Sequence, residues 1–198
     1  MNDGIIGQKW PQEWYGEDVC QAARHLLGAI LIHVIGDKFY AGRIVETEAY
    51  GGSFQGCPDD AAHSFRGRTA RTEPMFRPGG CSYVYQIYGM YYCMNVVTGR
   101  AGSGEAVLIR AVEPLSGLED MFRNRHMDIH TQNPQHLTNG PGKLCQAMEI
   151  TKAQNMLDLC GDELYIAEPA VRRPLKVSCS ARIHVDYAEK GKTFPWRY

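Results

Sequence analysis

Two glutamates and a tyrosine alternate along one short stretch of the chain. Glu46, Glu48 and Tyr50 occupy every second position near the end of the run G-R-I-V-E-T-E-A-Y at 42–50. Because side chains of a β-strand point alternately to opposite faces, we expect these three to share one face with Ile44. Paired carboxylates hydrolyse glycosidic bonds, bind divalent metals or form salt bridges on a solvated face. The pattern therefore indicates candidate catalytic carboxylates and leaves their chemistry open.

More side chains of the metal-ligating kind follow in the next segment. Asp59, Asp60 and His63 lie in the stretch 51–82, which is rich in Gly, Pro, Asp and Arg and has little periodicity. A long loop inside a compact domain is usually functional or disordered. Together with the two glutamates, these three residues could bind a divalent cation. A metal-dependent hydrolase is therefore one alternative.

Tyrosines gather in the segment that follows the loop. They are Tyr83, Tyr85, Tyr88, Tyr91 and Tyr92, with Asn95 shortly after. Gly89 divides two runs of aromatic and β-branched residues, which predicts a tight hairpin. Such a cluster is either core or a surface on which a planar ring can stack, and an aromatic side chain at the tip, Tyr88, can wedge between base pairs.

Basic side chains flank this aromatic segment. Arg66, Arg68 and Arg71 follow His63 closely, and Lys143 ends a Gly-Pro-Gly-Lys run that opens a predicted helix. These four are candidate contacts for DNA phosphates. The net charge of −1 argues against strong non-specific binding to nucleic acid, although residues 171–198 carry seven Lys and Arg against two acidic residues. A basic face on a nearly neutral protein can still meet a polyanion.

Local patterns predict the elements that position these side chains. We expect helices over 17–27, 116–124 and 151–159, and another that follows Gly142 and carries Leu144, Ala147 and Met148. We expect strands over 29–35, 39–50, 83–88, 90–97, 106–112, 164–167 and 175–185. Strand runs with helices grouped between them predict an α+β fold, a single domain over 1–198 with a mostly antiparallel sheet and flanking helices.

Composition narrows the class of protein. The 198 residues are 44% hydrophobic and 22% charged, as in folded domains, and the first four residues show no basic lead into an apolar run. We therefore expect no signal peptide, no membrane span and seven reduced cysteines. The expected location is not extracellular: cytoplasmic or nucleoid-associated if the source is bacterial, nuclear if it is eukaryotic.

Taken in order, five stretches resemble the alkyladenine (3-methyladenine) DNA glycosylase family of the mammalian type. They are G-R-I-V-E-T-E-A-Y at 42–50, D-D-A-A-H-S at 59–64, Y-V-Y-Q-I-Y-G-M-Y-Y-C-M-N at 83–95, A-V-L-I-R-A-V-E-P-L at 106–115 and N-G-P-G-K-L-C-Q-A-M at 139–148. The resemblance implies one mixed domain with a curved antiparallel sheet, no metal and no cofactor. Its partner would be double-stranded DNA that contains damaged bases, bound by a monomer.

The resemblance also implies roles for particular side chains. Glu48 would be the general base that activates water, and Arg110 would help to hold that water and the carboxylate. Tyr50 would stack on one face of an extruded base, with His63 and Tyr85 on the other. We expect Glu46 to form a structural pair, because the resemblance gives it no role.

Two further residues have implied contacts with the nucleic acid. Asn95 would screen out guanine by blocking its exocyclic amino group, and Tyr88 would fill the gap left in the duplex.

The implied reaction is hydrolysis of alkylated or deaminated purines (3-methyladenine, 7-methylguanine, hypoxanthine, ethenoadenine). No lysine lies in the matched catalytic stretch, so we expect no lyase step. The family usually continues beyond its P-W-R-F-Y segment into a strand whose backbone helps to hold the water, whereas this sequence ends at Tyr198. A non-catalytic damaged-base-binding protein is therefore the second alternative.

Overall fold

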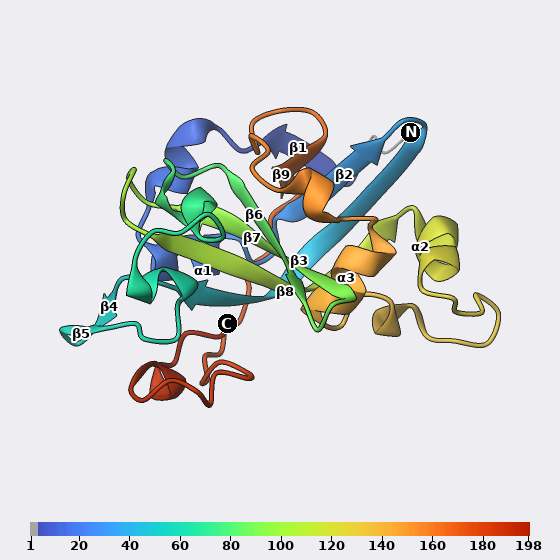
Figure 1. Ribbon diagram of the computed structural model, residues 1–198. Helices are drawn as coiled ribbons and strands as arrows, with labels where there is room; N and C mark the ends of the chain where they lie inside the picture. The colour runs from blue at the N-terminus through green and yellow to red at the C-terminus, as the bar shows by residue number, and fades with distance from the viewer. Residues whose placement is uncertain (1–3) are drawn as a thin grey trace.

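An open antiparallel sheet of seven strands organises the chain in the computed structural model, which describes residues 4–198 (Figure 1). Residues 1–3, part of the stretch in which we expect no signal peptide, lie outside the described residues. The strand order is β1-β9-β2-β3-β8-β7-β6, and each neighbouring pair is antiparallel. The strands are β1 (Ile6–Lys9), β2 (Ile30–Ile35), β3 (Lys38–Tyr50), β6 (Ser82–Ile87), β7 (Tyr91–Thr98), β8 (Glu105–Ser116) and β9 (Leu164–Pro169). A small pair, β4 (Ser53–Phe54) and β5 (Cys57–Pro58), lies in the predicted loop.

Three short α-helices accompany the sheet and confirm the predicted α+β class. They are α1 (Val19–His25), α2 (Leu118–Asn124) and α3 (Pro141–Ala147). Single 3-10 turns occupy Gln12–Gly16, His63–Arg66, Glu73–Phe76, Pro134–His136, Lys152–Gln154 and Gly191–Thr193. The carboxylate of Asp18 accepts hydrogen bonds from the first free amides of α1, which explains where that helix begins. None of the helices within residues 4–198 has the length and hydropathy needed to span a bilayer.

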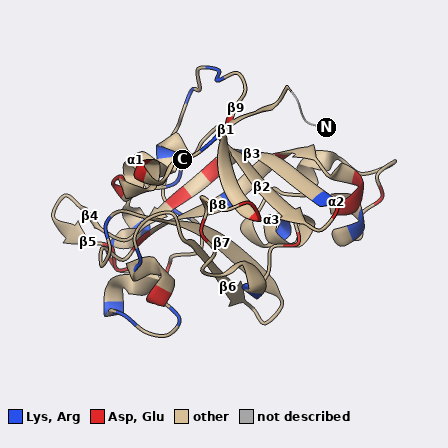
Figure 2. Ribbon diagram, turned by 90° about the horizontal axis from the view of Figure 1, so that it is seen from above, with Lys and Arg blue, Asp and Glu red and all other residues tan. Residues whose placement is uncertain are grey.

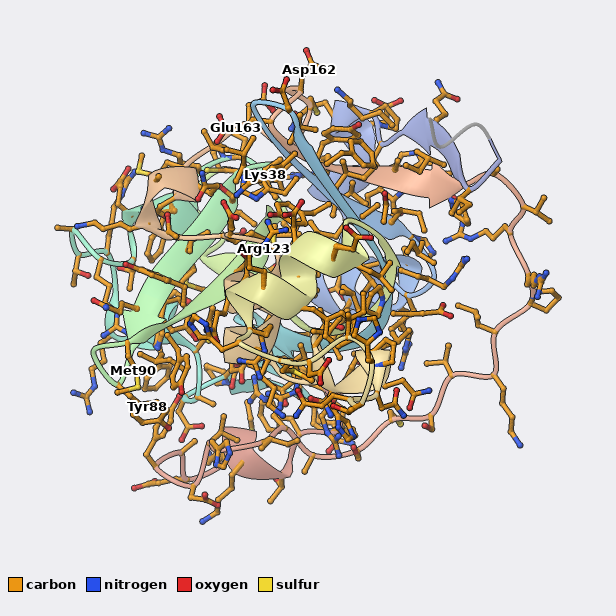
Figure 3. All side chains as sticks on the ribbon, turned by 90° about the vertical axis from the view of Figure 1, so that its right-hand side faces the viewer. Lys38, Tyr88, Met90, Arg123, Asp162 and Glu163 are labelled. Carbon is orange, nitrogen blue, oxygen red and sulfur yellow. The ribbon has the colours of Figure 1, made fainter. Side chains whose placement is uncertain are left out.

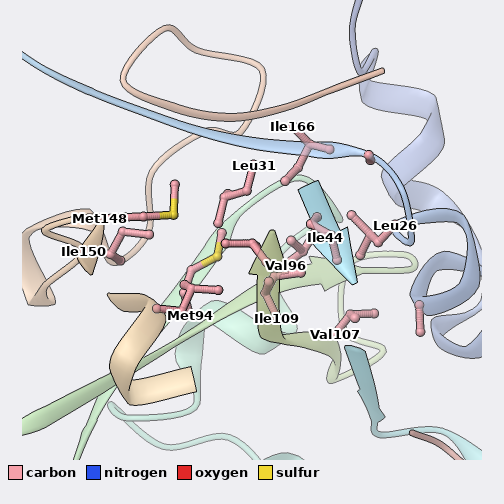
Figure 4. Close-up of a cluster of buried hydrophobic side chains, with 14 of the residues drawn as sticks. Leu26, Leu31, Ile44, Met94, Val96, Val107, Ile109, Met148, Ile150 and Ile166 are labelled. Carbon is pink, nitrogen blue, oxygen red and sulfur yellow. The ribbon is translucent and has the colours of Figure 1, made fainter. Parts of the chain in front are cut away.

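The main core lies between one face of the sheet and the helices α1 and α3. Leu31, Ile44, Val96 and Ile109 meet there and are at most 1% exposed (Figure 4). Val107 and Ile109 of β8 face this core, so Leu108 points to the opposite face. The helices thus seal one side of the sheet and leave the other side to the loops and the C-terminal segment.

Two compensating β-bulges shape the contact between β3 and β8. Ile44 pairs with Val112 and Glu46 with Ala111, so Val45 is an extra residue on β3. The next pair joins Thr47 to Ile109, so Arg110 is an extra residue on β8. A bulge of one residue reverses which face the following side chains occupy. The expectation that Ile44 shares a face with Glu48 is therefore wrong, because Ile44 points into the main core.

Two predicted elements are corrected. The helix expected over 151–159 is only the 3-10 turn Lys152–Gln154, since Thr151 and Gln154 cap each other and the chain then runs beside β6. The strand expected over 175–185 has no counterpart in the described chain. Both edges of β9 are already paired, with β1 and β2, so the segment 170–181 runs exposed over the surface instead.

Candidate active site

A cavity of about 600 Å³ opens on the face of the sheet opposite the main core. Strands β3, β6, β7 and β8 contribute side chains to it, and the turn at 63–66, the first turn of α3 and the C-terminal segment close its sides. Its walls include Tyr50, His63, Tyr83, Tyr85, Asn95, Leu108, Arg110 and Ile183. A cavity of this volume, with mostly apolar walls and a few polar groups, suits a small planar ligand.

Glu48 lies directly behind this wall and is fully buried. The hydroxyl of Tyr50 donates to its Oε2 at 2.8 Å, and Nη1 of Arg110 approaches the same oxygen at 3.3 Å. The backbone amide of Ile183 donates to Oε1 at 2.8 Å. A carboxylate has about four lone-pair positions, so three donors leave room for one more partner, such as a water molecule. Because all three donors line the cavity, such a partner would lie at its wall.

Glu46 has a different environment on the same strand. Its Oε1 accepts from Nε of Arg110 at 3.3 Å and from Nη1 of Arg197 at 2.9 Å. Arg110 therefore bridges both glutamates, which is possible because the β8 bulge directs its side chain between them. The structural pairing expected for Glu46 is confirmed.

An aromatic cage forms the opposite part of the cavity. The ring centroids of His63 and Tyr85 are 4.7 Å apart, and Tyr83 lies 5.1 Å from Tyr85. Nδ1 of His63 is 3.0 Å from the hydroxyl of Tyr83. Burial, assisted by the charge of Arg71, lowers the pKa of His63 to about 4, so the imidazole is neutral at pH 7. Burial also raises the pKa of Tyr50 and Tyr85 well above the usual value, so both phenols stay protonated.

Comparison with known proteins decides the family. The model of the methylpurine-DNA glycosylase family matches residues 13–198. The chain belongs to that family. A relative from Desulfitobacterium hafniense is 47% identical over 192 residues, which cover 94% of this chain and 92% of the relative. Relatives from Clostridium acetobutylicum (45% identical; 94% and 91%) and Bacillus cereus (43%; 95% and 93%) are similar, and all three carry the name "putative 3-methyladenine DNA glycosylase".

The hairpin of this methylpurine-DNA glycosylase chain presents an exposed tyrosine. Its strands end at Ile87 and resume at Tyr91, so each is one residue shorter at the tip than predicted. Tyr88 (φ 52°) and Gly89 (φ 70°) are both left-handed, as the tight turns that join antiparallel strands require. Tyr88 is 79% exposed and lies beside Met90 at the hairpin tip, at the edge of the cavity (Figure 3). This geometry fits a wedge at a protein surface.

Asn95 lies deeper, in the cavity wall on β7. Only 4% of it is exposed, and its amide nitrogen donates to the carbonyl of Tyr83 at 3.0 Å. That bond fixes the amide in one orientation against the cavity. The position is compatible with the screening role that the resemblance implies.

The four predicted phosphate contacts have different surroundings. Arg66 is exposed on the turn beside the cavity, and Lys143 lies at the cavity with its ammonium 2.9 Å from Oδ1 of Asn139. Arg71 also lines the cavity, 5.3 Å above the ring of Tyr85. Arg68 instead forms a two-point ion pair with Glu73, at 2.6 and 2.8 Å. The basic part of the 170–181 segment lies on the side of the molecule away from the β6–β7 hairpin (Figure 2).

Sequence reasoning missed the C-terminal wall of the site. Ile183, His184, Val185 and Tyr187 line the cavity, and Arg182 pairs with Asp59 just behind it. The sequence signal was weak, since residues 182–187 lie outside the five stretches that carry the resemblance in Sequence analysis. The backbone of Tyr198 pairs with that of Thr47 on β3, so this end of the sequence lies along the sheet near Glu48.

The four carboxylates that could bind a metal ion pair with protein groups instead. Asp59 is held by Arg182, whereas the carboxylate of Asp60 accepts amide hydrogens from residues 189–191. Glu46 and Glu48 share Arg110. Within residues 4–198 no group of three or more His, Cys, Asp or Glu side chains is arranged to hold a metal ion. The residues proposed for a metal-dependent hydrolase therefore do not form one site.

Proposed function

We propose that the protein is a base-excision DNA glycosylase in which Glu48 activates the water that hydrolyses the N-glycosidic bond of a damaged purine. The observation that carries the proposal is the contact set of Glu48: a buried carboxylate, held by Arg110, Tyr50 and Ile183, directly behind a cavity with aromatic walls. Membership of the methylpurine-DNA glycosylase family supports it.

The reaction needs the base outside the duplex. Extruding a nucleotide costs a few kcal/mol, least for a damaged or mispaired base, and Tyr88 would offset part of that cost by stacking in the gap. The extruded base would lie between Tyr50 on one side and His63 with Tyr85 on the other. A purine alkylated on a ring nitrogen is cationic and would gain cation–π attraction from these rings.

Bond cleavage then follows from the charges at the sugar. The electron pair of the N-glycosidic bond leaves with the base, and positive charge develops on the deoxyribose. The Glu48 carboxylate stabilises that charge and accepts a proton from water, whose oxygen forms the new bond to C1′. The products are the free base and an abasic site. Arg110 holds the carboxylate in its orientation.

The substrates that we propose are 3-methyladenine, 7-methylguanine, hypoxanthine and ethenoadenine in duplex DNA, acted on by a monomer whose 198 residues form one domain. We propose hydrolysis without a lyase step. Lys143 is the amine to test, because it lines the cavity. Borohydride should trap no covalent complex with DNA, and a trapped complex would contradict direct hydrolysis.

The central test is Glu48→Gln on a duplex with one hypoxanthine. Under single-turnover conditions, with alkaline cleavage of the abasic product, we expect the rate to fall about 10²–10⁴-fold, the usual contribution of a general base. Binding to the same duplex should persist. Glu113→Gln, an exposed carboxylate on β8, is the matched control. Normal excision by Glu48→Gln would refute the mechanism, and a wild-type protein that binds the lesion without releasing base would support the damaged-base-binding alternative.

A further inference from the structure

A guanidinium covers the ring of Tyr50 from behind. Cζ of Arg182 lies 4.6 Å from the centroid of that ring, and the side chain of Arg182 is fully buried. Tyr50 lines the cavity and Arg182 does not, so the cation lies against the ring face that an extruded base would leave unoccupied. The excision chemistry proposed above makes no use of this side chain.

Arg182 is held by a two-point ion pair that is closed to solvent. Its Nη1 and Nη2 donate to the two carboxylate oxygens of Asp59 at 2.7 and 2.6 Å, and the Asp59 side chain is also fully buried. Burial alone would disfavour the charged guanidinium, but the hydrogen bonds and charge of Asp59 outweigh it and raise the pKa of Arg182. The planar fork fixes the plane of the guanidinium, which a lysine ammonium could not do.

The pair joins three separate parts of the chain. Arg182 also donates to the carbonyl of Ala49 on β3 and to that of Gly191 near the C-terminus, both at 2.8 Å. Asp59 accepts from the amides of Gly51 at 2.9 Å and Ala61 at 3.1 Å, so it orders the loop that leads to the cavity. Strand end, loop and C-terminal segment therefore meet at one ion pair.

Two of the three donors to Glu48 depend directly on this arrangement. Tyr50, which donates to Oε2, rests on Arg182, and Ile183, whose amide donates to Oε1, is the next residue along the chain. The segment around Ile183 belongs to no helix or strand, so side-chain contacts must hold it in place. Fixing the guanidinium thus fixes the ring plane of Tyr50 and the amide of Ile183 together.

We propose that Arg182, paired with Asp59, is a positioning residue for base excision: it sets the placement of Tyr50 and Ile183 and thereby the orientation of the Glu48 carboxylate. This inference rests on the proposed function. A buried ion pair could instead serve stability alone, yet such pairs contribute little net stability compared with apolar residues of similar size. A purely structural role would change the folded fraction and leave the rate of the folded enzyme unaltered.

The test compares Arg182→Lys and Asp59→Asn with wild type. Lysine keeps the charge but loses the fork, and asparagine keeps the shape of Asp59 but loses its charge. Two quantities are measured: the single-turnover rate of hypoxanthine release, and the dissociation constant for a duplex with a tetrahydrofuran abasic analogue. Thermal melting reports the folded fraction of each protein. Arg43→Lys is the matched control, because Arg43 pairs with Glu113 elsewhere on the sheet.

We expect each variant to lose about 10–100-fold in rate, the usual effect of displacing a reacting group by about an ångström, with the dissociation constant within about threefold. The double variant should be no slower than the slower single variant, because the two residues act as one unit. Arg43→Lys should match wild type. Folded variants with wild-type rates, or rate losses that only follow the unfolded fraction, would overturn the inference. Failure of wild type itself to release base would instead count against the proposed function.

Discussion

The backbone amide of Ile183 donates a hydrogen bond of 2.8 Å to Oε1 of Glu48, although 135 positions separate the two residues. Glu48 is on a central strand of the sheet, whereas Ile183 is in a segment without regular structure. That segment is held by the ion pair of Arg182 with Asp59 and, two residues earlier, by the backbone pairing of Ser180 with Arg197. The carboxylate therefore depends for its orientation on a segment in which periodicity predicts a strand that the structure does not have.

Replacing the Ile183 amide should slow excision. Ile183→Pro removes the donor, and the loss of one hydrogen bond to a charged group, worth about 1.5–3 kcal/mol, corresponds to a rate loss of about 10–150-fold. Ile183→Val keeps the amide and most of the side chain, so it should stay within about threefold of wild type. Single-turnover release of hypoxanthine measures both. Equal rates for the two folded variants would show that the amide is not needed.

Periodicity was sufficient to predict an element where the local sequence alone determines its geometry. It predicted the strand that carries Glu48, the hairpin with Tyr88 at its tip and the antiparallel sheet, because alternation and turn chemistry are local. It failed at Ile44, where a bulge set by pairing with β8 reverses the face. Periodicity also predicted a strand over 175–185 that does not form, because both edges of β9 are already paired with other strands. Partners distant in sequence decided both outcomes.

Some residues of the site could be predicted from the sequence and others could not. Glu48, Tyr50 and Tyr85 could be predicted, because they lie on strands in stretches that resemble a family. Arg182 was not, since a lone arginine in S-A-R-I-H-V gives no local sign of burial. The sequence indicated Asp59 only as a possible metal ligand. Its partner is Arg182, and the pair forms because the fold brings the loop and the C-terminal segment side by side.

The exposed ring of Tyr88 should matter for holding the extruded base. Tyr88→Ala removes a stacking contact worth about 1–3 kcal/mol, so binding to a lesion duplex should weaken by roughly 5–150-fold. Tyr88→Phe retains the ring and should bind nearly as wild type does. Fluorescence of a 2-aminopurine placed beside the lesion reports extrusion for both. If alanine and phenylalanine variants behave alike, Tyr88 is not the wedge.

Asn95 should limit which bases are accepted. Shortening it with Asn95→Ala opens the cavity wall, so undamaged guanine in a G·T mismatch should be released faster than by wild type. Removing the side chain also leaves the carbonyl of Tyr83 without its present partner, at a cost of about 1–3 kcal/mol in stability. Asn133→Ala, at an exposed turn cap, is the control for general effects of the substitution. A guanine rate no higher than that of wild type would remove Asn95 from the selectivity of the site.

A carboxyl outside the site should make stability depend on pH. Glu105 begins β8, where burial and the charge of Asp18 raise its pKa from 4.5 to about 7. A raised carboxyl pKa favours the native state while the group is protonated. That contribution is complete below the unfolded value of 4.5 and is lost as pH rises through 7.

Glu105→Gln keeps a neutral side chain of the same shape at every pH. Its free energy of unfolding, relative to wild type, should therefore increase between pH 5 and pH 8, by about 1–2 kcal/mol once solvent screening at this partly exposed position is allowed for. Urea denaturation at the two pH values measures the difference. Glu113→Gln on the same strand, with a side chain 59% exposed, is the matched control for the loss of a glutamate charge. An offset for Glu105→Gln that does not change between the two pH values would contradict the raised pKa of Glu105.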